Sequence, residues 1–248
     1  MRRALELARG RLGRVWPNPA VGCVLAVDGV FVAEGATGGG GRPHGEVRAL
    51  EAAGDQARGA TAYVTLEPCS HWGRTPPCTE ALIAAGVSRV VVAMVDPDPR
   101  VNGTGLTALE RASIQVEVGL LEPEALQVNV GFLTRLRRGR PFVAVGTAHE
   151  DTFDAILRNV KGTDTVEATV VHPGAGPARF WVSHPHVLAP LGVVHLPVVG
   201  PPTPPAAVLA ALGEQGFTRV MVPSDDPWAE ELFRASLVDD AGATETSV

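Results

Sequence analysis

The feature that most constrains the fold is a run of apolar residues, RVVVAMV, at positions 89–95. A strand with an uninterrupted apolar run is typical of the interior of a sheet that is covered on both faces. Helical patterns flank this run at 77–86 and 104–112, and the first of them begins with proline and ends with glycine. The alternation of strands and helices predicts an α/β fold in which helices cover both faces of the sheet.

The rest of the first half extends this pattern and adds one antiparallel pair. Two apolar runs at 21–27 and 30–35 flank Asp28-Gly29, which is a hairpin signal. The sheet is therefore expected to be mixed, with both parallel and antiparallel neighbours. The other elements expected in this half are helices at 3–14, 44–57 and 123–137 and strands at 61–66 and 114–118.

A basic segment that ends in proline, LRRGRP at 136–141, suggests a boundary. We therefore predict one domain at 1–140 and a second at 141–248. The second is rich in Gly, Pro and Val, and its polar tail, 239–248, is expected to fray. Its predicted strands lie at 141–148, 166–171, 179–183, 193–199 and 217–222, and its predicted helices at 206–216 and 226–237.

Composition excludes several classes of protein. The 248 residues carry a net charge of −6 and a pI of about 5.6, so no nucleic-acid partner is expected. No apolar run is long enough to span a bilayer, and the N-terminal arginines precede no apolar signal segment, so neither a membrane partner nor secretion is expected. Three cysteines are too few for a disulfide scaffold, which favours a cytoplasmic protein with reduced thiols.

Two of the three cysteines lie in one short stretch, LEPCSHWGRTPPC at 66–78. Cys69 follows a predicted strand, Cys78 opens a predicted helix, and His44 precedes another helix. One His and two Cys are ligands that suit zinc and leave a fourth position open for water, as in a catalytic site. Glu46 is placed to move protons beside the metal. The alternative is that Cys69 and Cys78 only pack in a core, as we expect of Cys23.

This set of residues resembles the zinc deaminase signature H-x-E…P-C-x-x-C, although eight residues rather than two separate Cys69 from Cys78. The insert SHWGRTPP points to one branch. The segments PNPAVGCV, HGEV, TLEPCSHWGRTPPC, ALIAAGVSRVVVAMVDPDPRVNG and GFLTRLRRGRP resemble the deaminase domain of the bacterial riboflavin biosynthesis (RibD) family. The resemblance covers nearly all of 1–141. Gly45 stands where the family usually has alanine.

The resemblance implies a three-layer α-β-α mixed sheet of the cytidine deaminase type, followed by a shortened α/β reductase-like domain. It implies zinc on His44, Cys69 and Cys78, with Glu46 as the catalytic proton carrier. The family deaminates a phosphorylated pyrimidine, 2,5-diamino-6-ribosylamino-4(3H)-pyrimidinone 5′-phosphate, to 5-amino-6-(5-phosphoribosylamino)uracil. A homo-oligomer is also expected. By the same resemblance the substrate contacts are Asn18, His71, Arg74, Asp96 and Asn102.

In the family an NADPH-dependent reductase follows the deaminase, and 141–248 resembles parts of it. The parts expected to bind cofactor differ. GTAHEDT at 146–152 replaces a segment with a lysine and a Ser-Leu-Asp-Gly turn, and Pro223-Ser224-Asp225-Asp226 replaces a glycine-rich turn. Proline lacks an N–H and two carboxylates repel phosphate, so we predict a degenerate reductase and a separate protein for the reduction. NADPH is a cofactor only if this domain functions.

Three alternatives remain open at this point. The chain could be a bifunctional deaminase-reductase, a zinc deaminase redirected to another base or nucleoside, or a non-catalytic scaffold. The replaced lysine and glycines argue against the first, and the SHWGRTPP insert argues against the second. Glu46 argues against the third, because a scaffold has no use for a proton carrier beside zinc.

Overall fold

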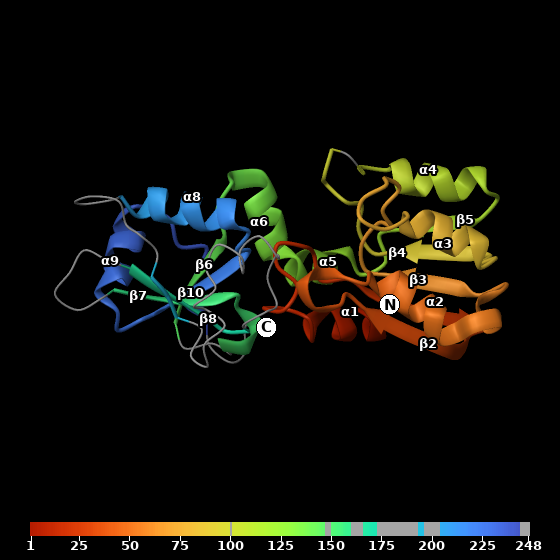
Figure 1. Ribbon diagram of the computed structural model, residues 1–248, viewed down its shortest axis with the longest axis horizontal. Coiled ribbons are helices and arrows are strands. Elements are labelled where there is room, and N and C mark those ends of the chain that lie inside the picture. The colour runs from red at the N-terminus through yellow and green to blue at the C-terminus, as the bar shows by residue number, and fades with distance from the viewer. Residues whose placement is uncertain (100, 147–149, 160–165, 173–192, 196–203, 244–248) are drawn as a thin grey trace. The chain divides into compact units, whose positions relative to one another are not determined.

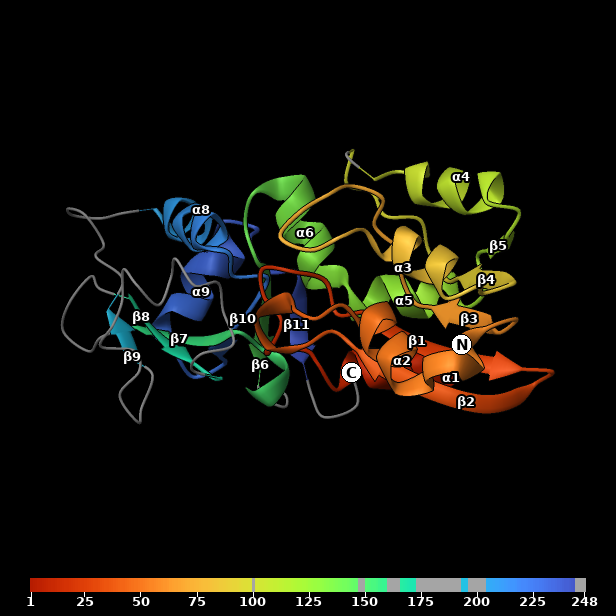
Figure 2. The same cartoon turned by 45° about the vertical axis from the view of Figure 1, so that its right-hand side comes forward.

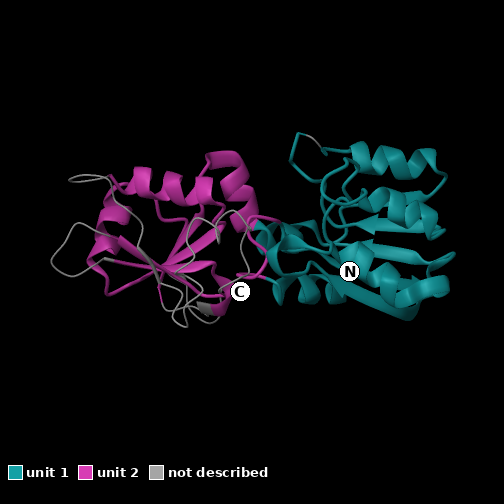
Figure 3. Cartoon of the chain, in the orientation of Figure 1, with its two compact units in different colours: residues 1–11, 19–129 teal, residues 12–18, 130–248 magenta. Residues whose placement is uncertain are grey.

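The computed structural model describes all residues except 100, 147–149, 160–165, 173–192, 196–203 and 244–248. The described chain forms two compact units (Figure 3). Unit 1 comprises residues 1–11 and 19–129, and unit 2 comprises residues 12–18 and 130–248. This division by packing differs from the functional division at 140/141, which stays a prediction.

Unit 1 is built on a five-stranded mixed sheet in the order β2-β1-β3-β4-β5 (Figure 1). β1 pairs antiparallel with β2 and β3, whereas β3, β4 and β5 run parallel. The apolar run at 89–95 supplies β4, between β3 and β5, and Val90, Val91 and Val92 are buried. The strands are β1 (Gly22–Val27), β2 (Val30–Ala36), β3 (Thr61–Val64), β4 (Arg89–Val92) and β5 (Gln115–Val118).

Helices cover both faces of this sheet, as the α/β pattern predicts. Gly22 lies against α1 and Gly35 against α2, and a Cβ on either residue would clash with helix backbone. Gly22 pairs with Ala36 and Gly35 with Cys23, so the two glycines face opposite sides of the sheet. The helices of unit 1 are α1 (Arg2–Arg9), α2 (Gly45–Ala53), α3 (Cys78–Ala84), α4 (Thr104–Arg111) and α5 (Glu122–Val128), with 3₁₀ turns η1 (Gly39–Gly41) and η2 (Gly54–Ala57).

The prediction of a single helix at 123–137 is wrong, because the chain forms two helices there, α5 and then α6 (Val130–Arg138). Asn129 separates them, and its buried side chain binds the backbone of Ala20. Asn129 Oδ1 accepts from Ala20 N at 2.9 Å, and Nδ2 donates to Ala20 O at 3.2 Å. These bonds to a distant segment fix the break, which helical periodicity does not reveal.

Unit 2 contains a six-stranded mixed sheet in the order β11-β6-β10-β7-β8-β9. β11, β6, β10 and β7 run parallel, and β8 is antiparallel to both β7 and β9. The strand predicted at 179–183 lies outside the described residues. The elements are β6 (Phe142–Gly146), η3 (Glu150–Thr152), β7 (Ala155–Asn159), β8 (Val166–Val170), β9 (Val193–His195), α8 (Pro205–Gln215), β10 (Arg219–Pro223), α9 (Pro227–Arg234) and β11 (Asp240–Ala243).

The prediction that the tail frays is wrong for its first half, because β11 pairs with β6 (Figure 2). Asp239 anchors this strand: its carboxylate accepts from Val143 N at 2.9 Å and from Arg138 and Arg140. Both arginines come from the basic segment that suggested a boundary. Arg138 and Arg140 are therefore paired with Asp239 within unit 2, where they help to hold β11.

β10 begins beside a second buried carboxylate, that of Asp154. Its Oδ2 accepts from Thr218 Oγ1 at 2.7 Å and from the backbone N–H groups of Thr218 and Arg219. Burial raises the pKa of Asp154 to about 6, although these donors oppose the shift. The Arg219 guanidinium lies over the rings of Phe142 and Phe153. Asp154 therefore fixes the register in which β10 enters the sheet.

The short segment 12–18 supplies Trp16 to the core of unit 2. The Trp16 ring is fully buried and stacks on Phe217, with ring centroids 4.5 Å apart and an interplanar angle of 14°. It packs in one cluster with residues of β6, β7, α8 and α9. None of the described helices is both long and apolar enough to cross a membrane.

We expect Trp16→Ala to lower the free energy of unfolding of unit 2 by about 3–5 kcal/mol, because it leaves a cavity against Phe217. Urea unfolding followed by circular dichroism measures the change. Trp72→Ala is the matched control: Trp72 is 68% exposed, so its loss should cost about 0.5 kcal/mol at most. Equal effects of the two substitutions would contradict the packing role of Trp16.

Candidate zinc site

Three elements of unit 1 bring the predicted ligands together. His44 is the N-cap residue of α2, Cys78 is the first residue of α3, and Cys69 lies in the loop that follows β3. The Cys69 loop is fixed to α3, because Cys69 O accepts from the Thr79 backbone and hydroxyl. The ligand atoms therefore come from helix starts and a strand end, where an open α/β sheet places its sites.

The geometry of these atoms fits a tetrahedral zinc ion. His44 Nδ1 lies 3.2 Å from Cys78 Sγ and 3.6 Å from Cys69 Sγ, and the three ligand atoms all lie within 4.8 Å of one another. Zn–N and Zn–S bonds of about 2.0 and 2.3 Å require tetrahedral edges of roughly 3.6 Å. His44 and Cys69 are half-buried and Cys78 is buried, so three protein ligands are held at one side of a partly accessible centre.

Glu46 lies in the first turn of α2 and is 3% exposed. Its Oε2 is buried and has no hydrogen-bond partner among the described residues. Burial raises the pKa of this carboxyl group. A buried carboxylate oxygen without a donor is costly to a fold, which indicates that it serves a group absent from the chain itself, such as water or substrate.

The ligand side chains shift one another's pKa values. Cys78 and His44 interact with the Cys69 sulfur, and the Cys78 backbone N–H lies 3.3 Å from it. These contacts lower the pKa of Cys69, with the Cys78 hydrogen bond the largest cause. The contact with Cys69 in turn raises the pKa of His44. The site therefore favours a thiolate, the form of cysteine that binds metal.

The insert that carries His71 and Arg74 is exposed. Both side chains lie on the surface of the segment 70–76, which has no regular secondary structure. One contact with the insert comes from Arg42, which precedes α2: its Nη1 donates to Thr75 Oγ1 at 2.5 Å. Trp72 Nε1 donates to Glu80 on α3 at 3.2 Å. The positions of His71 and Arg74 are compatible with substrate contact, and their roles stay predictions.

Asp96 and Asn102 lie in the segment between β4 and α4. Asp96 is 8% exposed, and its Oδ1 accepts from Asp98 N at 2.9 Å, which makes a tight turn. Asn102 is exposed and has a positive φ of 27°. Asn18 belongs to unit 2, where its Nδ2 donates to Val15 O at 3.2 Å. The substrate-binding roles of these three residues also stay predictions.

Sequence reasoning missed Glu67. Its carboxylate is 4% exposed and accepts hydrogen bonds from the backbone where the segment after β4 enters α4. The signal was visible, because an acidic residue stood between a buried strand and a predicted zinc ligand. Its partners are backbone N–H groups 29 to 39 residues away, which no sequence pattern reveals.

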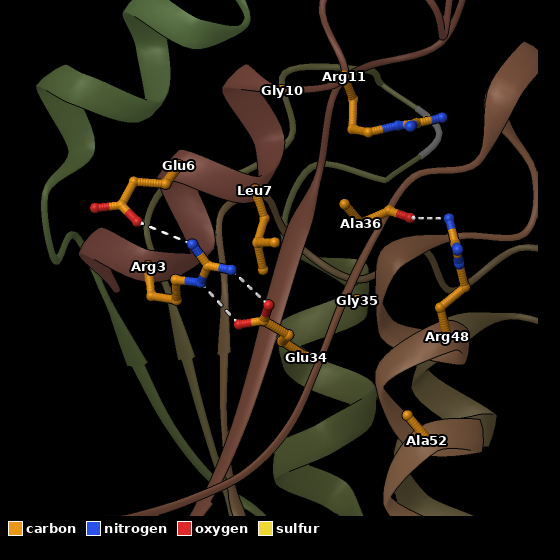
Figure 4. A pocket seen from close by; sticks show the side chains of 10 residues that line it. All are labelled: Arg3, Glu6, Leu7, Gly10, Arg11, Glu34, Gly35, Ala36, Arg48 and Ala52. Carbon is orange, nitrogen blue, oxygen red and sulfur yellow. Dashed lines mark hydrogen bonds and ion pairs between the residues drawn. The ribbon is translucent and has the colours of Figure 1, made fainter.

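A pocket of unit 1 lies at the free edge of β2, between α1 and α2 (Figure 4). Arg3 bridges Glu34, with bonds of 2.8 and 2.6 Å, and Glu6 at 3.3 Å. Arg48 Nη1 donates to Ala36 O at 3.3 Å. At this open strand edge Arg3 is paired with Glu34 and Glu6, and the backbone oxygen of Ala36 accepts from Arg48. The pocket lining includes none of the predicted site residues.

Comparison with known proteins agrees with the site. Residues 1–94 match the cytidine and deoxycytidylate deaminase zinc-binding region. The chain is 46% identical over 141 residues to the diaminohydroxyphosphoribosylamino-pyrimidine deaminase of Buchnera aphidicola, and the match covers 57% of this chain and 96% of that protein. The chain belongs to the RibD family. Its predicted resemblance and its α/β fold class are therefore confirmed.

Comparison with longer relatives shows how much of their length this chain matches. The chain is 59% identical over 144 residues to the Escherichia coli riboflavin biosynthesis protein RibD, and the match covers 58% of this chain and 39% of that protein. Acinetobacter baumannii RibD superposes with a TM-score of 0.73 at 30% identity, over 97% of this chain and 83% of that one. The matched region thus spans about two fifths of the Escherichia coli protein, while the structural likeness extends into unit 2.

We expect Cys78→Ser to lose zinc, because serine replaces a thiolate at one of the three ligands that the described residues bring together. Elemental analysis of the purified full chain measures the zinc content. Cys23→Ala is the matched control and should keep its zinc, since Cys23 is fully buried in β1 and is not part of the ligand group. Zinc retained in Cys78→Ser but lost from Cys23→Ala would contradict the assignment.

Proposed function

We propose that this chain hydrolytically deaminates a phosphorylated aminopyrimidine, namely the diamino-ribosylaminopyrimidinone phosphate of riboflavin biosynthesis. The observation that carries the proposal is the ligand group His44, Cys69 and Cys78 beside the buried, unpartnered Oε2 of Glu46. The family membership supports the choice of substrate. The three ligands would hold zinc, which when bound supplies a Lewis acid that makes water a better nucleophile at neutral pH.

Glu46 performs the proton transfers. Its carboxylate accepts a proton from the water that attacks the ring carbon bearing the 2-amino group. It then delivers that proton to the amino nitrogen, which leaves as ammonia as its bond to the ring carbon breaks. The second proton of the water moves from the oxygen to the adjacent ring nitrogen, so the product carries an oxo group and a ring N–H. The position of Glu46 in the first turn of α2, two residues after His44, keeps the carboxylate beside the ligand atoms without making it a ligand. Burial keeps bulk water away from this proton path.

The substrate is held by the surrounding loops. Arg74 and His71 offer N–H donors on the exposed insert, and a guanidinium is well suited to bind the two oxygens of a phosphate. Asp96 and Asn102, on the segment before α4, are further proposed contacts, and the role of Asn18 as a contact of the base stays a prediction. A phosphorylated small molecule is therefore the expected partner. A homo-oligomer and a separate reductase stay predictions.

We also propose that unit 2 is a reductase-like domain without reductase activity. Thermotoga maritima diaminohydroxyphosphoribosylaminopyrimidine deaminase/5-amino-6-(5-phosphoribosylamino)uracil reductase superposes with a TM-score of 0.73 at 28% identity, over 98% of this chain and 84% of that one. The turn after β10 argues against phosphate binding. Asp226 caps α9 by accepting from Trp228 N at 2.9 Å, so its carboxylate already occupies the helix N-terminus.

Neighbouring residues reinforce that argument. Pro223 and Pro227 lack the N–H groups that a phosphate would need, and Asp225 adds a second, exposed negative charge. A helix N-terminus binds anions through free N–H groups, so this turn repels the group that a dinucleotide cofactor presents. The segment 147–149, which includes part of the replaced lysine region, lies outside the described residues.

We expect Glu46→Gln to keep its zinc and to lose at least about a thousandfold in kcat, because an amide cannot carry the proton. Ammonia release from the phosphorylated substrate measures the rate. Glu51→Gln, on the exposed side of the same helix α2, is the matched control and should retain wild-type turnover. Substantial turnover by Glu46→Gln with zinc bound would remove Glu46 from the proposed mechanism.

A further inference from the structure

The Glu67 carboxylate is buried and accepts from four backbone N–H groups. Oε1 accepts from Gly105 N at 2.8 Å and Leu106 N at 3.4 Å, and Oε2 accepts from Gly103 N at 2.9 Å and Asp96 N at 3.2 Å. The side chain is 4% exposed. A carboxylate that accepts from four backbone N–H groups is fixed in position, because each of its oxygens is held by two donors. Both ends of the segment between β4 and α4 are therefore tied to one side chain.

The same side chain belongs to the loop that carries a zinc ligand. Glu67 is two residues before Cys69, and its own N–H donates to Met94 O at 3.0 Å. Gly105 approaches this loop so closely that a Cβ there would lie 2.1 Å from Pro68 O. The start of α4 and the Cys69 loop are thus in direct contact, with Glu67 at their junction.

A second bond reinforces the junction nearer the surface. Ser70 Oγ and Thr104 Oγ1 lie 2.6 Å apart, and Thr104 is the first residue of α4. Ser70 stands directly after Cys69 and directly before His71. The segment that carries Asp96 and Asn102 is therefore fastened at two points to the segment that carries Cys69, His71 and Arg74.

We propose that Glu67 is a positioning residue for the deaminase reaction. Its carboxylate holds Asp96 and residues 103–106 against the Cys69 loop and so sets where Asp96 and Asn102 meet the substrate. Glu67 touches neither the substrate nor the metal, and acts only through the backbone that it binds. The inference rests on the proposed function, because it names how that site holds its substrate.

Two acceptor oxygens are essential to this role. Three of the four donors, Gly103, Gly105 and Leu106, lie at the N-terminus of α4, where the helix dipole favours an anion. Glutamine has nearly the same shape but replaces one acceptor oxygen by an NH₂ group, which would face N–H groups. At least one pair of donors would then be left buried without an acceptor.

The experiment compares Glu67→Gln with Glu110→Gln in the full-length, zinc-loaded chain. Glu110 lies on the exposed side of α4, so its variant controls for the same chemical change on the same helix. We expect Glu67→Gln to raise KM about tenfold or more and to change kcat by less than about threefold. Zinc content should stay at the wild-type level, and Glu110→Gln should match wild type throughout.

Hydrogen exchange gives a readout that does not depend on turnover. In Glu67→Gln, amide exchange should accelerate in peptides that span 96–106 and stay unchanged in β1 and β3. Wild-type KM together with wild-type exchange would overturn the proposal. Loss of zinc and of kcat at unchanged KM would also overturn it, because Glu67 would then act at the metal.

Ser70→Ala keeps the test decisive if Glu67→Gln does not fold. It removes only the outer bond to Thr104 and should raise KM about twofold, with faster exchange at the start of α4. Unchanged KM and exchange in this variant would count against the locked junction. If the wild-type chain releases no ammonia, the proposed function fails, whereas the exchange data still decide whether Glu67 fixes the segment.

Discussion

The central physical constraint in unit 1 is the close approach of one imidazole and two thiols that come from separate elements. Two helices begin at or beside these ligands, and the strand-end loop that carries Cys69 is bonded to α3. Sulfur and nitrogen atoms at such short separations are compatible with a shared cation, which links α2, α3 and the β3 loop. Glu46 and Glu67 are both buried around this centre, and each carboxylate has a different task.

Unit 2 combines a buried core with a turn at which we propose that cofactor binding has been lost. Its core is complete, with Trp16 stacked on Phe217 and Asp239 holding β11 beside β6. The turn after β10, by contrast, has its helix N-terminus occupied by Asp226. The side chains that bury apolar area in unit 2 are different from those at the turn after β10, so the proposed loss of phosphate binding would leave the core intact.

Local patterns predicted much of the fold and most of the proposed site. The apolar run of β4, the Asp28-Gly29 hairpin and the helix starts at His44 and Cys78 are signals within a few residues. Features that depend on distant partners were missed or misjudged. The break at Asn129 needs Ala20, β11 needs Arg138 and Arg140, and the role of Glu67 needs Gly103 and Gly105. Periodicity carries no information about such contacts.

The most direct test of the account is mass spectrometry of the products formed by the purified chain. The protein is given the diamino-ribosylaminopyrimidinone phosphate together with NADPH. The account predicts a product that carries only the amino-to-oxo change, with ammonia released and NADPH unconsumed. A product that also gained two hydrogens would contradict the loss of reductase activity in unit 2. Unchanged substrate in the presence of zinc-loaded protein would contradict the deaminase assignment itself.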